Sequence, residues 1–223
     1  MIRPQAVAIT VDGSKVSGLL QVPRKARFCY VLAHGAGAGM AHPFMAAIAD
    51  GLGERGIATL RYQFPYMEQG RKRPDAPKLA QATVSAAVAE ASLLLPDFAL
   101  VAGGKSFGGR MTSQAQAISP LPGVRGLVFL GFPLHPAGHP SNERGDHLFE
   151  IKVPMLFLQG TRDALADTEF VKALVKRLGK PATLKLFQDA DHSFHVSARS
   201  GRNDEEVRAK MLDELAAWLE THV

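Results

Sequence analysis

Short apolar runs alternate with amphipathic stretches along most of this chain, and this alternation constrains the fold more than any other feature. Runs such as Phe28–Ala33 and Val153–Leu158 are apolar, as expected for strands buried on both faces of a sheet. Between such runs, apolar residues recur at helical spacing, as in Val207, Met211 and Leu215. The pattern predicts an α/β fold in which helices cover both faces of a mostly parallel, twisted sheet.

The same patterns predict the order of the elements. An antiparallel hairpin is expected first, because Asp12-Gly13-Ser14 separates two β-like runs. The predicted strands are Ala6–Val11, Lys15–Val22, Phe28–Ala33, Ile57–Tyr62, Phe98–Ala102, Val124–Phe132, Val153–Leu158 and Ala182–Phe187. Helices are predicted in five places. One begins at Pro43 and stops at Gly56, an alanine-rich one ends before Pro96, and one ends at about Ile118; the last two cover Phe170–Leu178 and Val207–Trp218.

No interdomain linker interrupts these elements, so residues 1–223 are expected to form a single domain. The polar segment Leu134–Glu150, rich in His, Pro and Gly, is the one sizeable excursion. Because no long insertion separates the strands, we expect a minimal lid or none.

Composition excludes several classes of protein. With 46% apolar residues and a formal net charge of +5 over 223 residues, the chain is far from the composition of a disordered protein. Its apolar runs are shorter than the roughly 18 residues of a membrane span. A single cysteine, Cys29, allows neither an internal disulfide nor a Cys-based zinc site. The start lacks a signal-peptide pattern, so we expect a cytoplasmic protein with no membrane partner.

The positive net charge raises the question of nucleic-acid binding, for which Arg71-Lys72-Arg73 is the best support. Prolines bracket this cluster, and no aromatic residues interleave with the charges as a base-stacking surface would require. We therefore interpret the cluster as a solvated loop and expect no nucleic-acid partner.

Gly104-Lys105-Ser106-Phe107-Gly108 matches G-x-S-x-G, and its context supports the match. A predicted strand precedes the motif and a predicted helix follows it, which is the arrangement of a nucleophile elbow. Such a turn projects the Ser106 hydroxyl above the carboxyl end of the sheet, where the helix N-terminus faces a developing oxyanion. The alternative is a glycine-rich turn that only packs tightly. The context favours Ser106 as a nucleophile.

A serine nucleophile needs a base, normally a histidine that a carboxylate orients. His192 follows the last predicted strand, whereas His195 is expected to be a surface or packing histidine. Asp163 follows another strand and is the predicted acid; Asp167 is the alternative, and Asp163 could instead cap the following helix. Ser106, Asp163 and His192 each come directly after a predicted strand, so their side chains can converge at one edge of a parallel sheet.

The glycine-rich segment His34–Gly39 follows the third predicted strand, where this arrangement places a backbone donor for an oxyanion hole. We assign that donor to Ala36, with Gly37 close behind, and the second donor to the amide of Phe107. A phosphate-binding function is less well supported, because neither G-x-G-x-x-G nor a Walker lysine pattern is present.

The expected pocket is open, and its predicted substrate-binding residues are Gly37, Phe64, Tyr66 and Phe132. No metal or organic cofactor is expected, because a serine site of this kind needs none. The prolines and the glycine among His135, His139 and His147 disfavour the helix that would align them as metal ligands.

The motifs together resemble those of the α/β-hydrolases, specifically the small, nearly lidless dienelactone-hydrolase-like branch and a group of bacterial hydrolases. The resemblance runs from about residue 5 to the end and is carried by His34–Phe44, Arg61–Pro65, Gly104–Arg110, Gly160–Asp163 and Asp191–Phe194. It implies a triad of Ser106, Asp163 and His192. It departs from true dienelactone hydrolases, which carry a cysteine nucleophile: position 106 is serine, and Cys29 begins a buried strand.

These features predict a serine hydrolase that cleaves a carboxylic ester or a related small acyl substrate through an acyl-enzyme. A peptidase or an acyltransferase would use the same triad and stays an alternative. The bacterial group is also similar to a eukaryotic subunit of a histone acetyltransferase complex whose role is interaction, so a non-catalytic interaction module is a further alternative. The sequence does not fix the oligomeric state.

Overall fold

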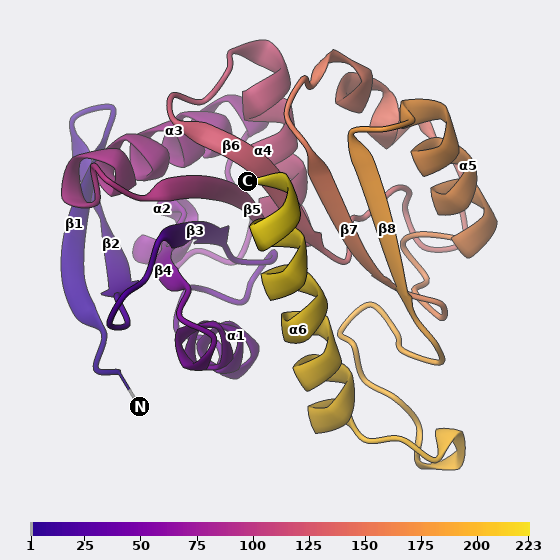
Figure 1. Ribbon diagram of the computed structural model, residues 1–223. Helices are drawn as coiled ribbons and strands as arrows, with labels where there is room; N and C mark the ends of the chain where they lie inside the picture. Colours follow the sequence, from indigo (N-terminus) through magenta and orange to yellow (C-terminus); the bar gives the residue numbers. More distant parts are fainter. Residues whose placement is uncertain (1) are drawn as a thin grey trace.

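Eight strands form one sheet in the computed structural model, which describes residues 2–223 (Figure 1). The strands are β1 (Gln5–Val11), β2 (Ser14–Gln21), β3 (Phe28–Ala33), β4 (Ala58–Tyr62), β5 (Ala99–Lys105), β6 (Val124–Leu130), β7 (Met155–Gly160) and β8 (Ala182–Phe187). Their order in the sheet is β1-β2-β4-β3-β5-β6-β7-β8. The β1–β2 and β2–β4 pairs are antiparallel and all the others are parallel, which confirms the predicted N-terminal hairpin and mostly parallel sheet.

The helices cover both faces of this sheet, also as predicted. They are α1 (Pro43–Glu54), α2 (Pro65–Glu68), α3 (Pro77–Leu94), α4 (Phe107–Ile118), α5 (Thr168–Leu178) and α6 (Asp204–His222), with 3₁₀ helices η1 (Glu143–Glu150) and η2 (Ala198–Ser200). In Figure 1, α6 crosses one face beside α1. The helices α3, α4 and α5 pack on the opposite face, so two apolar layers enclose the sheet.

Strand β3 explains why the central strands are apolar at every position. Tyr30 and Leu32 pack into the layer of α1 and α6, whereas Cys29, Val31 and Ala33 pack into the layer of α3 and α4. Successive side chains of a strand point to opposite faces, so a strand with helices on both sides needs an unbroken apolar run.

The main difference from the sequence prediction is at β5, which continues three residues beyond Ala102 to Lys105. Gly103 and Gly104 carry the extension and pair with β6 and β3. A Cβ at Gly104 would lie 2.2 Å from the carbonyl oxygen of Ala33, and its φ of +152° is one that residues with a side chain rarely adopt. The glycines therefore allow the strand to stay paired until it reaches Ser106.

Two segments expected to be irregular contain short helices. The loop before Pro77 includes α2, which begins at Pro65, and the excursion Leu134–Glu150 ends in η1. Proline is favoured in the first turn of a helix, because its fixed φ suits that turn and its missing N–H is not needed there. The sequence analysis did not use this signal at Pro65.

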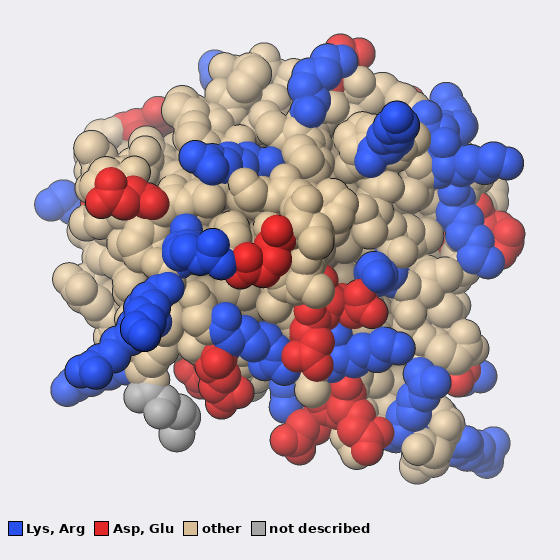
Figure 2. All heavy atoms as spheres, in the orientation of Figure 1, with Lys and Arg blue, Asp and Glu red and all other residues tan. Residues whose placement is uncertain are grey.

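The surface carries charges of both signs. On the face that shows α6, Lys and Arg side chains lie among Asp and Glu side chains (Figure 2). In the loop expected to be solvated, Arg71 pairs with Asp75 at 2.9 Å, and Lys72 and Arg73 are exposed. Within residues 2–223, no helix is both long and apolar enough to cross a membrane.

Candidate active site

Ser106, Asp163 and His192 come together at the carboxyl edge of the parallel strands. Ser106 follows β5, Asp163 follows β7 and His192 follows β8. His192 Nε2 lies 2.8 Å from Ser106 Oγ, and His192 Nδ1 lies 2.6 Å from Asp163 Oδ2. The three side chains form one hydrogen-bonded chain in which a carboxylate orients a histidine and the histidine contacts a hydroxyl.

Ser106 occupies a strained turn between β5 and α4. Its φ of 51° and ψ of −115° lie outside the regions that L-residues favour. The turn is tight because a Cβ at Gly108 would lie 2.5 Å from the carbonyl oxygen of His34. This close approach places the hydroxyl above the sheet and the first turn of α4 directly behind it, as the nucleophile-elbow interpretation predicted.

Asp163 is held in place by three donors. Its carboxylate is buried; Oδ1 accepts from the backbone N–H of Leu165 at 2.8 Å. Oδ2 accepts from His192 Nδ1 and from Gln159 Nε2, which lies 2.5 Å away. Gln159 is itself buried in β7 and also accepts from the backbone N–H of Phe132 at 2.9 Å. This contact of Gln159 was not predicted from the sequence, although a glutamine inside an apolar strand was its signal.

Asp167, the alternative acid, has a different place. It caps α5 and accepts from the backbone N–H groups of Glu169 and Phe170 at 2.9 and 3.3 Å. Its exposed side chain does not contact His192. The geometry therefore favours Asp163, and helix capping, which was considered for Asp163, belongs to Asp167.

His195, the neighbour of His192, lies on the surface as expected. Its Nδ1 is 2.8 Å from Asp204 Oδ2, and this exposed contact raises the pKa of His195. Its hydrogen bond joins the His192 loop to the start of α6, away from Ser106.

Two backbone amides next to Ser106 have no partner among residues 2–223, namely those of Ala36 and Phe107. Two neighbouring amides of the glycine-rich loop are occupied: Gly37 N–H donates to the Tyr66 hydroxyl at 2.8 Å, and Ala38 N–H donates to the carbonyl of Gly35 at 3.2 Å. Gly37 is therefore unavailable as the alternative donor, whereas Ala36 and Phe107 are free to bind an oxyanion.

His34 fixes the start of the same loop. Its Nδ1 lies 2.8 Å from the carbonyl of Gly35, and its Nε2 accepts from the backbone N–H of Phe64 at 3.2 Å. Burial lowers the pKa of His34 to about 4, since a charged imidazole would lose its hydration there. A neutral ring with one donor and one acceptor matches both partners, so His34 supports the loop rather than exchanging protons.

A cavity of about 430 Å³ opens beside Ser106 and His192. Its lining is mainly apolar, with no acidic side chain among the lining residues. They are Gly35, Ala36, Ala38, His42, Phe44, Met45, Lys105, Ser106, Leu165, His192 and Ser193.

The pocket wall differs from the predicted one. Phe64, Tyr66 and Phe132 are at most 2% exposed and belong to the apolar core, so they do not line the cavity. Phe64 packs edge-on against Phe107 and against His34, the first residue of the glycine-rich segment His34–Gly39, which we call the oxyanion loop. Phe64 lies against the residue that follows Ser106, but the sequence did not show that these rings point into the core.

Cys29 lies apart from this cavity. It is fully buried in β3, and burial raises the pKa of its thiol to about 12. A thiol kept protonated in this way is a poor nucleophile, and its burial agrees with the start of a buried strand predicted at Cys29.

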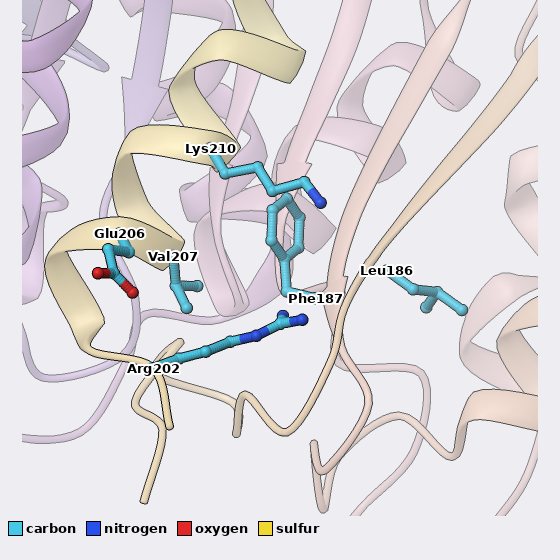
Figure 3. A pocket seen from close by; sticks show the side chains of 6 residues that line it. All are labelled: Leu186, Phe187, Arg202, Glu206, Val207 and Lys210. Atoms are coloured by element: carbon cyan, nitrogen blue, oxygen red, sulfur yellow. The ribbon is translucent and has the colours of Figure 1, made fainter. Parts of the chain in front are cut away.

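A second cavity, of about 270 Å³, lies between β8 and α6 (Figure 3). Phe187 and Val207 form its apolar floor, and Arg202 and Lys210 extend over it from opposite sides. It contains no serine, histidine or aspartate, so it offers no nucleophile and base of the kind found at Ser106.

The strand order and the serine at the β5–α4 turn define an α/β-hydrolase. A family model for the alpha/beta hydrolase domain matches residues 26–220, and the chain belongs to this family. This membership confirms the resemblance seen in the sequence.

Solved structures with the same fold include a dienelactone hydrolase from Anabaena variabilis ATCC 29413, with a TM-score of 0.80 and 19% identity over 100% of this chain and 99% of that one. An α/β serine hydrolase without lid from Xanthomonas campestris has a TM-score of 0.75 and 19% identity, covering 97% and 95%. The esterase domain of a Rhodothermus marinus protein has a TM-score of 0.71 and 17% identity, covering 97% and 98%. These likenesses confirm the predicted fold.

Proposed function

We propose that this α/β-hydrolase is a serine hydrolase that cleaves a carboxylic ester or a related small acyl compound through an acyl-enzyme. The observation that carries the proposal is the hydrogen-bonded chain from Asp163 through His192 to Ser106, which opens into a cavity. Membership of the alpha/beta hydrolase family supports hydrolysis as the reaction class.

Each group has a role in the proposed reaction. His192 Nε2 takes the proton of Ser106 Oγ as the oxygen attacks the carbonyl carbon of the substrate, and Asp163 stabilises the imidazolium. The amides of Ala36 and Phe107 bind the oxyanion. His192 then protonates the leaving alcohol. Water, deprotonated by the same histidine, attacks the acyl-enzyme and releases the carboxylic acid and free Ser106.

The cavity favours a small acyl group. Phe44, Met45 and Leu165 supply apolar contact area within about 430 Å³, which suits a short acyl chain or a single ring better than a long lipid. The lining contains no acidic side chain that would bind the amino group of a peptide, which favours an ester over a peptide substrate. The esterase domain and the dienelactone hydrolase with this fold are consistent with that class.

A fluorophosphonate probe tests the catalytic proposal directly, because it reacts with an activated serine. We expect the wild-type protein to be labelled and Ser106→Ala to stay unlabelled. Ser113→Ala is a matched control: Ser113 Oγ lies 2.7 Å from His147 Nε2, a second serine–histidine contact outside the cavity. This control should be labelled like the wild type. An unlabelled wild type, beside a serine hydrolase that reacts, would favour the non-catalytic interaction module.

Substrate class is tested by p-nitrophenyl esters of increasing acyl length and by peptide anilides. We expect kcat/KM to be highest for short acyl chains and to fall for chains that exceed the cavity. Faster cleavage of the anilides than of matched esters would establish a peptidase, and transfer of the acyl group to an added alcohol in preference to water would establish an acyltransferase.

A further inference from the structure

Lys105, the residue before Ser106, makes contacts that the proposed mechanism does not use. Its Nζ donates to the backbone carbonyl of His192, and its ammonium lies 5.6 Å from the centre of the Phe194 ring. A single side chain on β5 therefore contacts the loop that carries His192, next to the serine that this histidine must reach.

The rest of the Lys105 side chain is half-buried: it packs on a neighbouring loop and also lines the cavity beside Ser106. A Cβ at Gly35 would lie 3.4 Å from Lys105 Cγ, so the aliphatic part of the lysine packs on the oxyanion loop. A Cβ at Gly131 would lie 3.0 Å from Lys105 Nζ and 3.5 Å from His192 Cε1, so the ammonium and the imidazole share one small space. The lysine lies between the two loops that the reaction needs aligned.

Stability alone does not explain a lysine at this position. Burying an ammonium without an ion pair is unfavourable, and an apolar side chain of similar volume would avoid that penalty. Within the described chain, no carboxylate lies within ion-pair distance of Nζ. The charge instead faces Asp163 and Asp191, which stabilise it from a greater distance.

We propose that Lys105 is a positioning residue whose ammonium fixes the backbone of His192, so that the imidazole stays aligned between Ser106 and Asp163. The inference rests on the proposed function, because alignment of His192 has a measurable effect only if His192 acts as the base. Lys105 itself takes no proton from the substrate and forms no bond to it.

Titration of Lys105 gives the proposal a readout beyond folding. Burial lowers the pKa of Lys105 to about 8, and the charges of Asp163 and Asp191 partly oppose this shift. The titratable groups that face it are those two aspartates and His192. Above about pH 8 the ammonium becomes a neutral amine, which is a weaker donor. The rate should therefore fall with Lys105 deprotonation.

The test compares kcat, KM and the rate of fluorophosphonate labelling between pH 6 and pH 10 for the wild type and two variants. Lys105→Met keeps the volume and removes donor and charge. We expect a roughly ten- to hundredfold lower kcat at pH 7 and no decline above pH 8, whereas the loss of a substrate contact, since Lys105 also lines the cavity, would raise KM and leave kcat unchanged. Lys105→Gln keeps a neutral donor. Its kcat should lie between those of the wild type and of Lys105→Met, also without the alkaline decline. Lys172→Met, which removes an exposed lysine of α5, should match the wild type.

Several results would overturn the proposal. One is a wild-type kcat in a folded Lys105→Met protein, and another is an alkaline decline that persists in the variants. A loss of thermal stability with an unchanged pH profile would show a purely structural role. These outcomes differ from failure of the proposed function, in which the wild type, with Lys105 intact, is not labelled at all.

Discussion

Gln159 Nε2 lies 2.5 Å from Asp163 Oδ2, the same oxygen that accepts from His192 Nδ1. A neutral amide inside β7 thus fixes the carboxylate that orients the histidine. The arrangement extends the hydrogen-bonded chain of the site by one residue into the core, where Gln159 is fully buried. The alignment of Asp163 with His192 therefore depends on Gln159, a side chain that does not line the cavity.

Replacing Gln159 by methionine should lower kcat by about ten- to hundredfold, because the carboxylate loses one of its donors and can rotate away from His192. KM should change little, since Gln159 does not line the cavity. Steady-state kinetics with a p-nitrophenyl ester provide the measurement. Gln188→Met, at an exposed position after β8, is the control and should retain full activity. An unaltered kcat in Gln159→Met would exclude the positioning role.

Asp163→Asn and Asp167→Asn distinguish the two candidate acids. Asparagine at position 163 would favour the wrong histidine tautomer, and we expect kcat to fall by about 10⁴-fold. At position 167 it still caps α5, because an asparagine oxygen accepts from the same backbone amides, so activity and stability should be close to wild type. The reverse result would transfer the role of orienting acid to Asp167.

Removing the Tyr66 hydroxyl should affect the oxyanion loop without changing the pocket lining. In Tyr66→Phe the Gly37 amide loses its partner, the loop becomes more mobile, and kcat should fall roughly three- to thirtyfold. Tyr30→Phe is the matched control, because its buried hydroxyl bonds to Val128 O at 2.8 Å and neither residue lines the cavity. It should reduce the free energy of unfolding by about 1 kcal/mol and leave kcat unchanged. Equal kcat values for both variants would contradict the loop-support role.

Strain at Ser106 predicts a gain in stability when the serine is lost to glycine. The φ of 51° with ψ of −115° is accessible to glycine but not to alanine. We expect Ser106→Gly to unfold at a higher temperature than Ser106→Ala, and its free energy of unfolding to be about 1 kcal/mol larger. Differential scanning calorimetry of the two inactive variants measures the difference. Equal midpoints would mean that the turn stores no strain.

Buried His34 and half-buried His147 predict a loss of stability in mild acid. Burial lowers the pKa of His34 and of His147 to about 4, whereas an unfolded histidine titrates near 6.5. Between these values the unfolded chain binds more protons than the folded one. The free energy of unfolding should therefore fall as the pH drops from about 6.5 to about 4, by roughly 3 kcal/mol for fully buried His34.

Urea unfolding at pH 7 and at pH 4.5 measures this loss. In His147→Gln the difference between the two pH values should be smaller, because the glutamine amide replaces the bond to Ser113 but does not titrate. His139→Gln, at an exposed position, should keep the wild-type difference. If the free energy of unfolding depends on pH as strongly in His147→Gln as in the wild type, groups other than His147 cause that dependence.

The sequence predicted the sheet, and the meeting of Ser106, Asp163 and His192 at its edge, for the same physical reason. Buried parallel strands are continuous apolar runs that end abruptly, so a polar residue soon after such a run, as at Ser106 after β5 or Asp163 after β7, is placed at the edge of the sheet by topology alone. Some strands end later than the sequence predicted, because glycines continue the pairing: β5 extends three residues past its predicted end through Gly103 and Gly104.

The pocket wall was not predictable in the same way. Whether Tyr66 faces the cavity or the core depends on where α2 turns the chain, and on the hydrogen bond from the Gly37 amide to its hydroxyl. The roles of Gln159 and Lys105 depend on contacts across β7, β5 and the His192 loop. Spacing along one chain does not encode such contacts, because they arise only when strands distant in sequence dock.

The position of His192 after the last strand of the sheet also sets the order in which the site is assembled during synthesis. The nucleophile turn at Ser106 is translated 86 residues before its base. A nascent chain that has folded as far as β6 contains Ser106 but neither Asp163 nor His192. Under the proposed function, reactivity toward an electrophile should appear only when β7 and β8 have docked, so probe labelling of Ser106 would report the completion of folding as well as catalysis.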